Sequence, residues 1–244
     1  MHVSCICPTY GRAPRHIHLL EEAIESFLRQ DYVWKEMIVM NDAPQELQIS
    51  DYCKDERVRV INCAERYPTL GAKYNAAIEI AEGELLCPWE DDDISLPHRL
   101  SLSVDILGDS DSWNPHRHWY FHGNPPVLTS THPMGVSHNA SIFTRAIWEQ
   151  VGGYPEISGP QDTKMDGLLR TNGHRRVHVL EPIEQWFYIY RWGVSPCHLS
   201  ARRDTQTFYD EVGVRPVEPG PFLLQPHWRQ DYEVLCREHI EALG

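Results

Sequence analysis

The sequence is short of positive charge. Its 244 residues hold 22 Lys and Arg against 35 Asp and Glu, which gives a formal net charge of -13 with His neutral. A chain of that charge repels an extended phosphate backbone at long range, so the composition argues against nucleic acid as a partner. A small anionic ligand stays compatible, because a divalent cation can invert the local sign of the charge.

Long apolar runs are also missing. No stretch approaches the roughly 20 apolar residues that a membrane helix needs, and the N-terminus shows no basic segment followed by an apolar one. The seven cysteines are odd in number and scattered, which favours reduced thiols over a disulfide framework. We therefore expect a cytoplasmic protein without a membrane span.

Short apolar runs alternate with amphipathic segments in the first half of the chain. The pattern predicts strands at 2–8, 36–40, 58–61 and 84–89 and helices at 16–30 and 70–83. The second half predicts loops or short strands over 109–133, a strand feeding a short helix over 141–153, and helices at 162–172 and 231–242. Alternating strands and helices predict an α/β fold with a parallel sheet wound by right-handed crossovers.

Polar residues follow three of the predicted strands. They are Pro8-Thr9-Tyr10 after the first strand, Asn41-Asp42 after the second and the acidic run Glu90-Asp91-Asp92-Asp93 after the fourth. In open α/β sheets, ligands bind outside the carboxyl ends of the strands. We therefore predict a binding site at this edge of the sheet.

The acidic run places four like charges at the end of an apolar segment. Carboxylate oxygens suit a hard divalent cation such as Mg²⁺ or Mn²⁺, which often bridges protein carboxylates to substrate phosphates. A solvated acidic turn at the start of the following helix is the alternative. The run alone does not decide between them.

The order of the motifs adds to this interpretation. A strand ending in PTYGR, a second ending in NDAP, the segment LGAKYNAAIEIAEGELLCPWEDDDISLPHRL, the segment 141–154 and then Gln161-Asp162 resemble the family-two glycosyltransferases of the GT-A fold. The similarity covers about the first 200 residues. It implies a Rossmann-like, mostly parallel sheet flanked by helices, with an abutting acceptor-side subdomain. We expect a nucleotide-sugar half at 1–105, an acceptor-binding and catalytic half at 106–203, and a C-terminal arm with a short helix at 204–244.

The resemblance implies a nucleotide-sugar site. In the family, the loop after the first strand and the acidic residue after the second hold the nucleoside, and the matching positions are Pro8, Thr9, Tyr10, Arg12 and Asp42. The alternatives are that Tyr10 packs on its own strand and that Asp42 makes an Asx turn.

Two residues of the predicted helix at 70–83 extend this site. Lys73 stands where many members carry an arginine near the nucleotide, and Asn75 is similarly placed. For Lys73 a solvated surface charge is the alternative.

The acidic run resembles the DxD signature, which binds a metal ion together with the ribose and diphosphate of the donor. Counted back from Pro97, Glu90 takes the place of the usual first aspartate. The resemblance implies metal binding by Asp92 and Asp93, a donor contact from Asp91, and Mn²⁺ or Mg²⁺ as the cofactor. It also places His198, in the segment YRW followed by HLS, as a further metal ligand, with a structural histidine as the alternative.

Asp162 matches the aspartate that serves the family as general base for the acceptor hydroxyl, and an N-cap is the alternative. The resemblance thus implies a metal-dependent inverting glycosyltransferase that moves a sugar from a nucleotide-sugar donor, preferably a UDP-sugar, to a saccharide or another hydroxyl-bearing acceptor. Two other functions stay open from the residues alone. One is a nucleotidyltransferase of similar topology, and the other is a non-catalytic module that binds a carbohydrate or a divalent ion.

Overall fold

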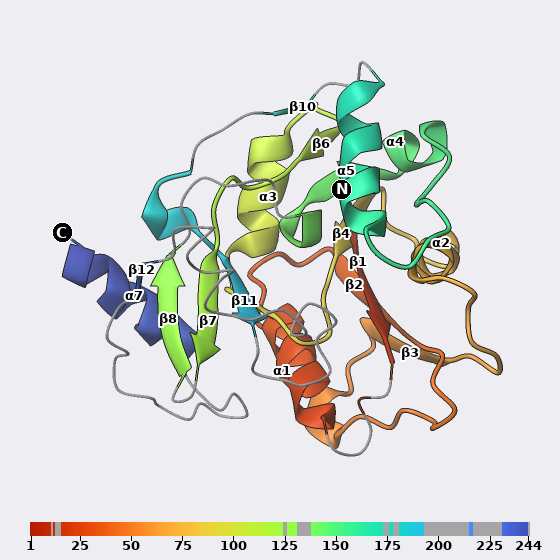
Figure 1. The fold of residues 1–244 in the computed structure, drawn as a ribbon, viewed down its shortest axis with the longest axis horizontal. Coiled ribbons are helices and arrows are strands. Elements are labelled where there is room, and N and C mark those ends of the chain that lie inside the picture. Colours follow the sequence, from red (N-terminus) through yellow and green to blue (C-terminus); the bar gives the residue numbers. More distant parts are fainter. Residues whose placement is uncertain are drawn as a thin grey trace.

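The computed structural model describes residues 1–10, 12, 16–123, 126–130, 138–172, 176–177, 181–192, 215–216 and 231–243. In the first half of the chain strands are interleaved with helices, as the sequence predicts, whereas several strands follow one another in the second half (Figure 1). The main helices are α1 Ile17–Leu28, α2 Leu70–Glu79, α3 Arg99–Leu107, α4 Arg145–Gln150, α5 Gln161–Thr171 and α7 Tyr232–Leu243.

A seven-stranded main sheet carries the fold, in the order β10-β6-β9-β4-β1-β2-β3. Its strands are β1 Val3–Thr9, β2 Lys35–Asn41, β3 Val58–Asn62, β4 Leu85–Pro88, β6 Ser112–Trp113, β9 Ile142–Thr144 and β10 Arg176–Val177. The pairs of β1 with β2 and β4, of β2 with β3 and of β10 with β6 are parallel, and β9 pairs antiparallel with both of its neighbours. The sheet is therefore mostly parallel.

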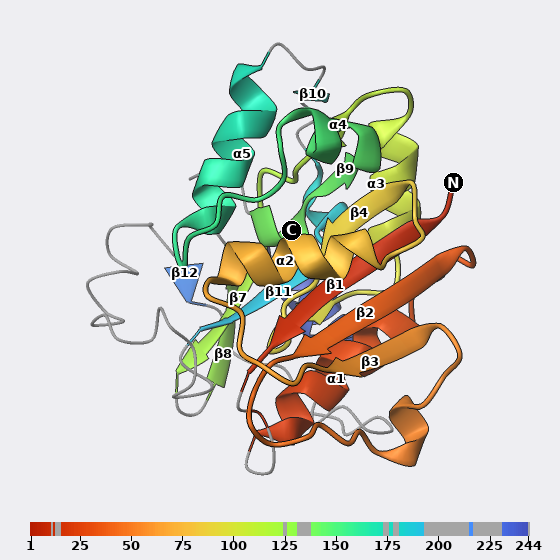
Figure 2. The same ribbon diagram turned by 90° about the vertical axis from the view of Figure 1, so that its right-hand side faces the viewer.

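Both faces of the main sheet are buried, which explains why its strands read as continuous apolar runs. Along β1, Cys5 and Cys7 belong to a core shared with α1, whereas Ile6 belongs to a second core shared with α2. Figure 2 shows α2 crossing one face of β1 and β2, with α1 on the other side. The helices α1 and α2 therefore pack against opposite faces of the sheet at β1.

A second, five-stranded sheet abuts the first, in the order β12-β8-β7-β11-β5. Its strands are β5 Ile94–Ser95, β7 Trp119–Gly123, β8 Pro126–Ser130, β11 Tyr188–Trp192 and β12 Arg215–Pro216. Because β5 follows the acidic run directly, this sheet is tied to the predicted site. The predicted C-terminal helix is present as α7 and packs on β8 (Figure 1).

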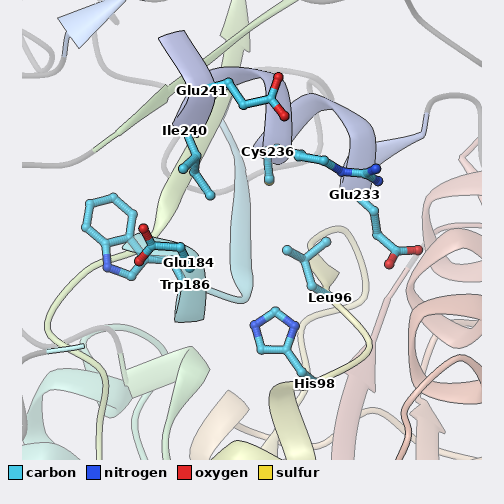
Figure 3. Close-up of a pocket in the computed structure, with 9 residues that line it drawn as sticks. Leu96, His98, Glu184, Trp186, Glu233, Cys236, Ile240 and Glu241 are labelled. Atoms are coloured by element: carbon cyan, nitrogen blue, oxygen red, sulfur yellow. The ribbon is translucent and has the colours of Figure 1, made fainter. Parts of the chain in front are cut away.

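A cavity of about 420 Å³ lies beneath α7. It opens between α7 and the residues that follow β5, and Figure 3 shows its wall and rim. Its lining residues are Leu96, His98, Glu184, Trp186, Glu233, Cys236, Arg237, Ile240 and Glu241. None of them belongs to the predicted site, so this cavity is separate from the strand ends.

Some features differ from the sequence-based expectation. The chain turns back through β5 into α3, and β11 joins a sheet that the pattern did not predict. The expected division after residue 105 falls inside α3, and the division of the chain into two halves stays a prediction. Among the described helices, none combines the length and the apolar character needed to cross a bilayer.

Candidate active site

The carboxyl ends of β1, β2 and β4 lie side by side at one edge of the main sheet. Thr9, the last residue of β1, pairs with Asn41 at the end of β2, and Ile6 pairs with Pro88 at the end of β4. The acidic run at 90–93 therefore leaves the sheet beside the loop that follows β1. Three of the predicted polar segments meet here.

Arg12 binds two carboxylates of the acidic run. Its Nε donates to Asp91 Oδ2 over 2.7 Å, and its Nη2 donates to Asp91 Oδ1 over 2.6 Å and to Asp92 Oδ2 over 2.8 Å. Thr9 Oγ1 also donates to Asp91 Oδ2, over 2.5 Å. Burial lowers the pKa of Arg12, but the hydrogen bonds and charges of Asp91 and Asp92 outweigh burial and raise it. The guanidinium thus offsets part of the repulsion within the run.

A second buried ion pair joins α2 to the end of β2. Lys73 Nζ donates to Asp42 Oδ1 over 2.5 Å and to the carbonyl oxygen of Thr9 over 3.0 Å. Asp42 Oδ2 accepts from the backbone N–H of Tyr67 over 3.0 Å. Lys73 is therefore no solvated surface charge. The Asx contact considered for Asp42 is made by Asn41, whose Oδ1 accepts from the backbone N–H of Ala43.

Tyr10 stands at the mouth of this edge with 44% of its surface exposed. The guanidinium carbon of Arg66 lies 4.3 Å from the centre of the Tyr10 ring, and Lys73 Nζ lies 5.9 Å from it. An exposed ring beside cations is a stacking surface for a planar ligand such as a nucleobase. Sequence reasoning missed Arg66, because no local pattern places the loop after β3 over the loop after β1.

Asp93 is held by the second sheet. It is 2% exposed, and its carboxylate accepts hydrogen bonds from the Tyr188 hydroxyl and, over 2.7 Å, from the backbone N–H of Arg191. The Arg191 side chain donates to the carbonyl oxygen of Asp92 and, over 2.5 Å, to Glu22 on α1. These partners fix the backbone of the acidic run. No sequence pattern indicated Glu22 or Tyr188, which lie far from the run along the chain.

Glu90 lies against α2. Its Oε1 accepts from the Tyr74 hydroxyl over 2.8 Å, and Tyr74 stacks on Tyr154 with ring centres 4.6 Å apart. Burial, followed by the charges of Asp93 and Asp92, raises the pKa of Glu90 to about 8. The protonated form of Glu90 is therefore favoured more strongly than that of an exposed glutamate.

Asp162 lies in the first turn of α5 and is partly exposed. Its Oδ1 accepts from the backbone N–H of the next residue, Thr163, over 2.7 Å, and the N-cap position belongs to Pro160. The pKa of Tyr154 is raised by burial first and then by the charges of Glu90 and Asp162. Asp162 and the acidic run thus lie within electrostatic reach of the same tyrosine.

Asn75 differs from the expectation. Its Oδ1 accepts from the backbone N–H of Tyr154 over 2.7 Å and from Trp148 Nε1 over 3.2 Å, and its Nδ2 donates to the carbonyl oxygen of Tyr154 over 2.9 Å. The amide therefore fastens α2 to the segment before α5. These three hydrogen bonds leave the Asn75 amide few atoms with which to bind a nucleotide. Its predicted contact with the nucleotide stays a prediction.

The carboxylates of the run offer few free oxygens for a metal ion. Within the described ranges, no three His, Cys, Asp or Glu side chains converge as ligands. Asp92 Oδ1 accepts no hydrogen bond from the part of the chain that the structure describes, whereas both oxygens of Asp91 are used. Mg²⁺ and Mn²⁺ need only one or two carboxylates when phosphate oxygens and water complete the shell. Asp92 fits such a site, and the predicted ligand His198 lies outside the described residues.

The model of the family described as glycosyl transferase family 2 matches residues 4–149, more than half of the chain. The chain belongs to this family. The matched range contains the strand-end loops, Lys73 and the whole acidic run. The predicted membership is thereby confirmed, and with it the assignment of the chain as a glycosyltransferase domain.

Solved structures share the GT-A architecture. S. aureus TarS 1-349 in complex with UDP-GlcNAc matches with a TM-score of 0.60 and 18% identity, over 86% of this chain and 64% of that one. The mannosyltransferase PcManGT from Pyrobaculum calidifontis, in complex with GDP-Man and Mn²⁺, matches with a TM-score of 0.57 and 20% identity, over 82% of this chain and 59% of that one. The predicted fold class is confirmed.

Among curated proteins, the uncharacterized protein y4gI of Sinorhizobium fredii is 26% identical over 240 residues. The match covers 88% of this chain and 25% of that protein. The chain therefore spans about a quarter of the length of this curated relative.

Proposed function

We propose that this chain transfers a sugar from a nucleotide-sugar donor to the hydroxyl group of an acceptor, with inversion at the anomeric carbon. One observation carries the proposal. In a family 2 chain, the ion pairs of Arg12 with Asp91 and Asp92, and of Lys73 with Asp42, meet at the carboxyl ends of three neighbouring strands. Opposed charges in this position suit a ligand that carries a diphosphate and a polar base.

The donor is proposed to be a UDP-sugar. Tyr10 and Arg66 offer faces for a pyrimidine ring, and Asp42 beside them offers acceptor oxygens to a base N–H. Pro8 and Thr9 shape the loop beneath, and Lys73 adds a positive charge for phosphate. Two of the similar solved structures, both of TarS, hold UDP-GlcNAc or UDP, which supports this choice of base over the guanine of the PcManGT complex.

We place the proposed Mn²⁺ or Mg²⁺ on Asp92. When bound there, a divalent cation would neutralise the charge that develops on the departing nucleoside diphosphate. Asp91 stays with Arg12 and faces the donor. Asp93 contributes by fixing the run to β11, and the open oxygen of Asp92 is available for the cation.

Asp162 is proposed as the general base. Among the described residues, Asp162 accepts hydrogen bonds only from Thr163 of its own helix terminus, and such a partly exposed carboxylate can accept the proton of an incoming hydroxyl. The Tyr154 hydroxyl, which lies 2.7 Å from His138 Nε2, would line the acceptor side near that proton. In this scheme the acceptor oxygen loses its proton to Asp162 as it attacks the anomeric carbon, and the nucleoside diphosphate leaves from the opposite face.

The test is release of nucleoside diphosphate from a panel of UDP-sugars, with Mn²⁺ and a mixture of saccharide acceptors. We expect Asp162→Asn to lower the rate at least about 100-fold, the scale of general-base catalysis, while binding of UDP is unchanged. Asp51→Asn is the matched control, because Asp51 is exposed and forms a surface ion pair with Lys54. Full activity of Asp162→Asn would remove Asp162 from the mechanism. If the protein binds a divalent ion tightly but neither binds nor cleaves a nucleotide sugar, the result would favour a non-catalytic ion-binding module instead.

A further inference from the structure

Arg12 occupies the carboxylates that the proposed metal ion would use. Its guanidinium is 7% exposed and makes three charge-assisted hydrogen bonds of 2.6 to 2.8 Å to Asp91 and Asp92. The Nη2 atom is shared between the two residues, and its partner on Asp92 is Oδ2. A metal ion on the other oxygen of Asp92 would therefore meet a positive charge on the same carboxylate.

The arginine is not fully satisfied in this position. Its Nη1 is buried and has no hydrogen-bond partner in the described structure. A buried guanidinium N–H without an acceptor costs free energy, because it has lost water without replacement. An anionic ligand placed at Nη1 would supply the missing acceptor, and phosphate oxygens match the fork of an arginine well.

We propose that the Arg12 guanidinium competes with the divalent cation for the Asp92 carboxylate. The diphosphate of the donor binds Arg12 and thereby removes the guanidinium from Asp92. Without nucleotide, the protein then holds the cation weakly. When a nucleoside diphosphate binds, Nη1 and Nη2 turn to its oxygens, and Asp92 is released for the cation. The inference rests on the proposed donor site, and it makes Arg12 the residue that couples cation binding to nucleotide binding.

Removal of the arginine charge has a clear expected effect. Arg12→Gln leaves Asp91 and Asp92 as two uncompensated neighbouring carboxylates, which attract a divalent cation more strongly. At separations near 4 Å and an effective dielectric constant of about 20, the repulsion between one unit charge and a cation changes the affinity for that cation by about tenfold or more. Arg12→Gln should therefore bind Mn²⁺ at least about tenfold more tightly than the wild type when no nucleotide is present.

The experiment is a titration of free Mn²⁺ by electron paramagnetic resonance, without nucleotide, for the wild type, Arg12→Gln and Arg12→Lys. Arg29→Gln is the matched control, because Arg29 also pairs with a carboxylate, Glu25, but on α1 away from the acidic run. We expect the order Arg12→Gln, Arg12→Lys, wild type from tightest to weakest, since lysine keeps the charge but lacks the fork. Arg29→Gln should match the wild type.

Equal or weaker Mn²⁺ binding by Arg12→Gln would overturn the proposal. If circular dichroism shows that Arg12→Gln is unfolded, Arg12→Lys decides in its place, and Mn²⁺ affinity equal to that of the wild type would overturn the proposal. A second titration with UDP present measures the coupling: UDP should tighten Mn²⁺ binding more in the wild type than in Arg12→Gln. Failure of the wild type to bind any nucleotide would refute the proposed function, whereas the nucleotide-free titration would still test the competition at Asp92.

Discussion

At the scale of single residues, two buried cations offset part of the negative charge at the strand ends. Arg12 sits between Asp91 and Asp92, Lys73 sits on Asp42, and both cations are buried. Breaking a buried pair leaves an uncompensated charge, which is far more costly than losing a surface pair. A ligand that displaces either cation must therefore supply a replacement partner for the charge that is left behind.

Arg66 provides a residue-scale prediction about the nucleobase. A cation–π contact of the kind seen between Arg66 and Tyr10 is worth about 0.5 to 2 kcal/mol, so Arg66→Ala should weaken UDP binding about 2- to 30-fold. Inorganic pyrophosphate, which has no base, should bind to the variant as it does to the wild type. Both affinities are measured by calorimetry.

The control for Arg66→Ala is Lys54→Ala, which also removes an exposed cation. Lys54 forms a surface ion pair with Asp51. Net charge changes equally in the two variants, so long-range attraction of an anion changes similarly. A parallel loss of UDP and pyrophosphate affinity in Arg66→Ala would mean that Arg66 acts on phosphate and not on the base.

At the scale of elements, α2 is the helix that joins the proposed donor side to the proposed acceptor side. Lys73 points to the strand ends, while Asn75 holds the backbone of Tyr154 and Gly71 lies directly against the loop before α5. The backbone N–H of Gly71 donates to the carbonyl oxygen of Ile157 over 3.1 Å. A shift of α2 would thus move both Lys73 at the strand ends and the loop before α5.

Gly71→Ala tests this close approach. A Cβ at residue 71 would lie 1.9 Å from the carbonyl oxygen of Pro155, so α2 and the loop must move apart. We expect a loss of about 1 to 3 kcal/mol in the free energy of unfolding, the range for overpacked sites, together with weaker transfer activity. Urea unfolding measures the first effect.

Gly167→Ala is the matched substitution in another helix. Gly167 lies within α5, and a Cβ there would meet nothing within 4 Å. Alanine is the better helix former, so this variant should gain up to about 1 kcal/mol. Equal behaviour of the two variants would show that the contact of α2 with Pro155 is not tight.

At the scale of the whole molecule, the second sheet places a buried titratable group beneath the site. His118 packs with its ring edge against Tyr188 and Tyr190, at centre distances of 5.8 and 6.2 Å. Burial lowers its pKa from 6.5 to about 4. The folded state thus favours the neutral ring, and the unfolded state takes up the proton first.

The sign of the pH dependence follows from this shift. Stability from His118 is fully present above pH 6.5 and is lost as the pH falls toward about 4. One such group changes the free energy of unfolding by at most about 1.4 kcal/mol per pH unit. His118→Phe should therefore show a shallower loss of stability between pH 6.5 and 4 in urea titrations, whatever its stability at neutral pH. An unchanged slope would show that His118 does not carry the effect.

The first half of the fold could be predicted because buried parallel strands read as apolar runs and their ends are marked by polar turns. Thr9, Asp42 and the acidic run were found in this way. The partners of these residues could not be predicted, because Arg191 and Glu22 reach the run from β11 and α1, and periodicity carries no information on such distant contacts. For the same reason the hydrogen bonds of Asn75 with Tyr154 could not be predicted, and its contact with the nucleotide stays a prediction.

The measurement that tests the donor site most directly is a calorimetric titration of UDP into the protein with and without Mn²⁺, with GDP as the comparison. We predict that UDP binds more tightly than GDP, and that Mn²⁺ strengthens the binding of UDP while UDP strengthens that of Mn²⁺ by the same factor. Binding of Mn²⁺ without binding of either nucleotide would contradict the proposal that these strand ends form a nucleotide-sugar site.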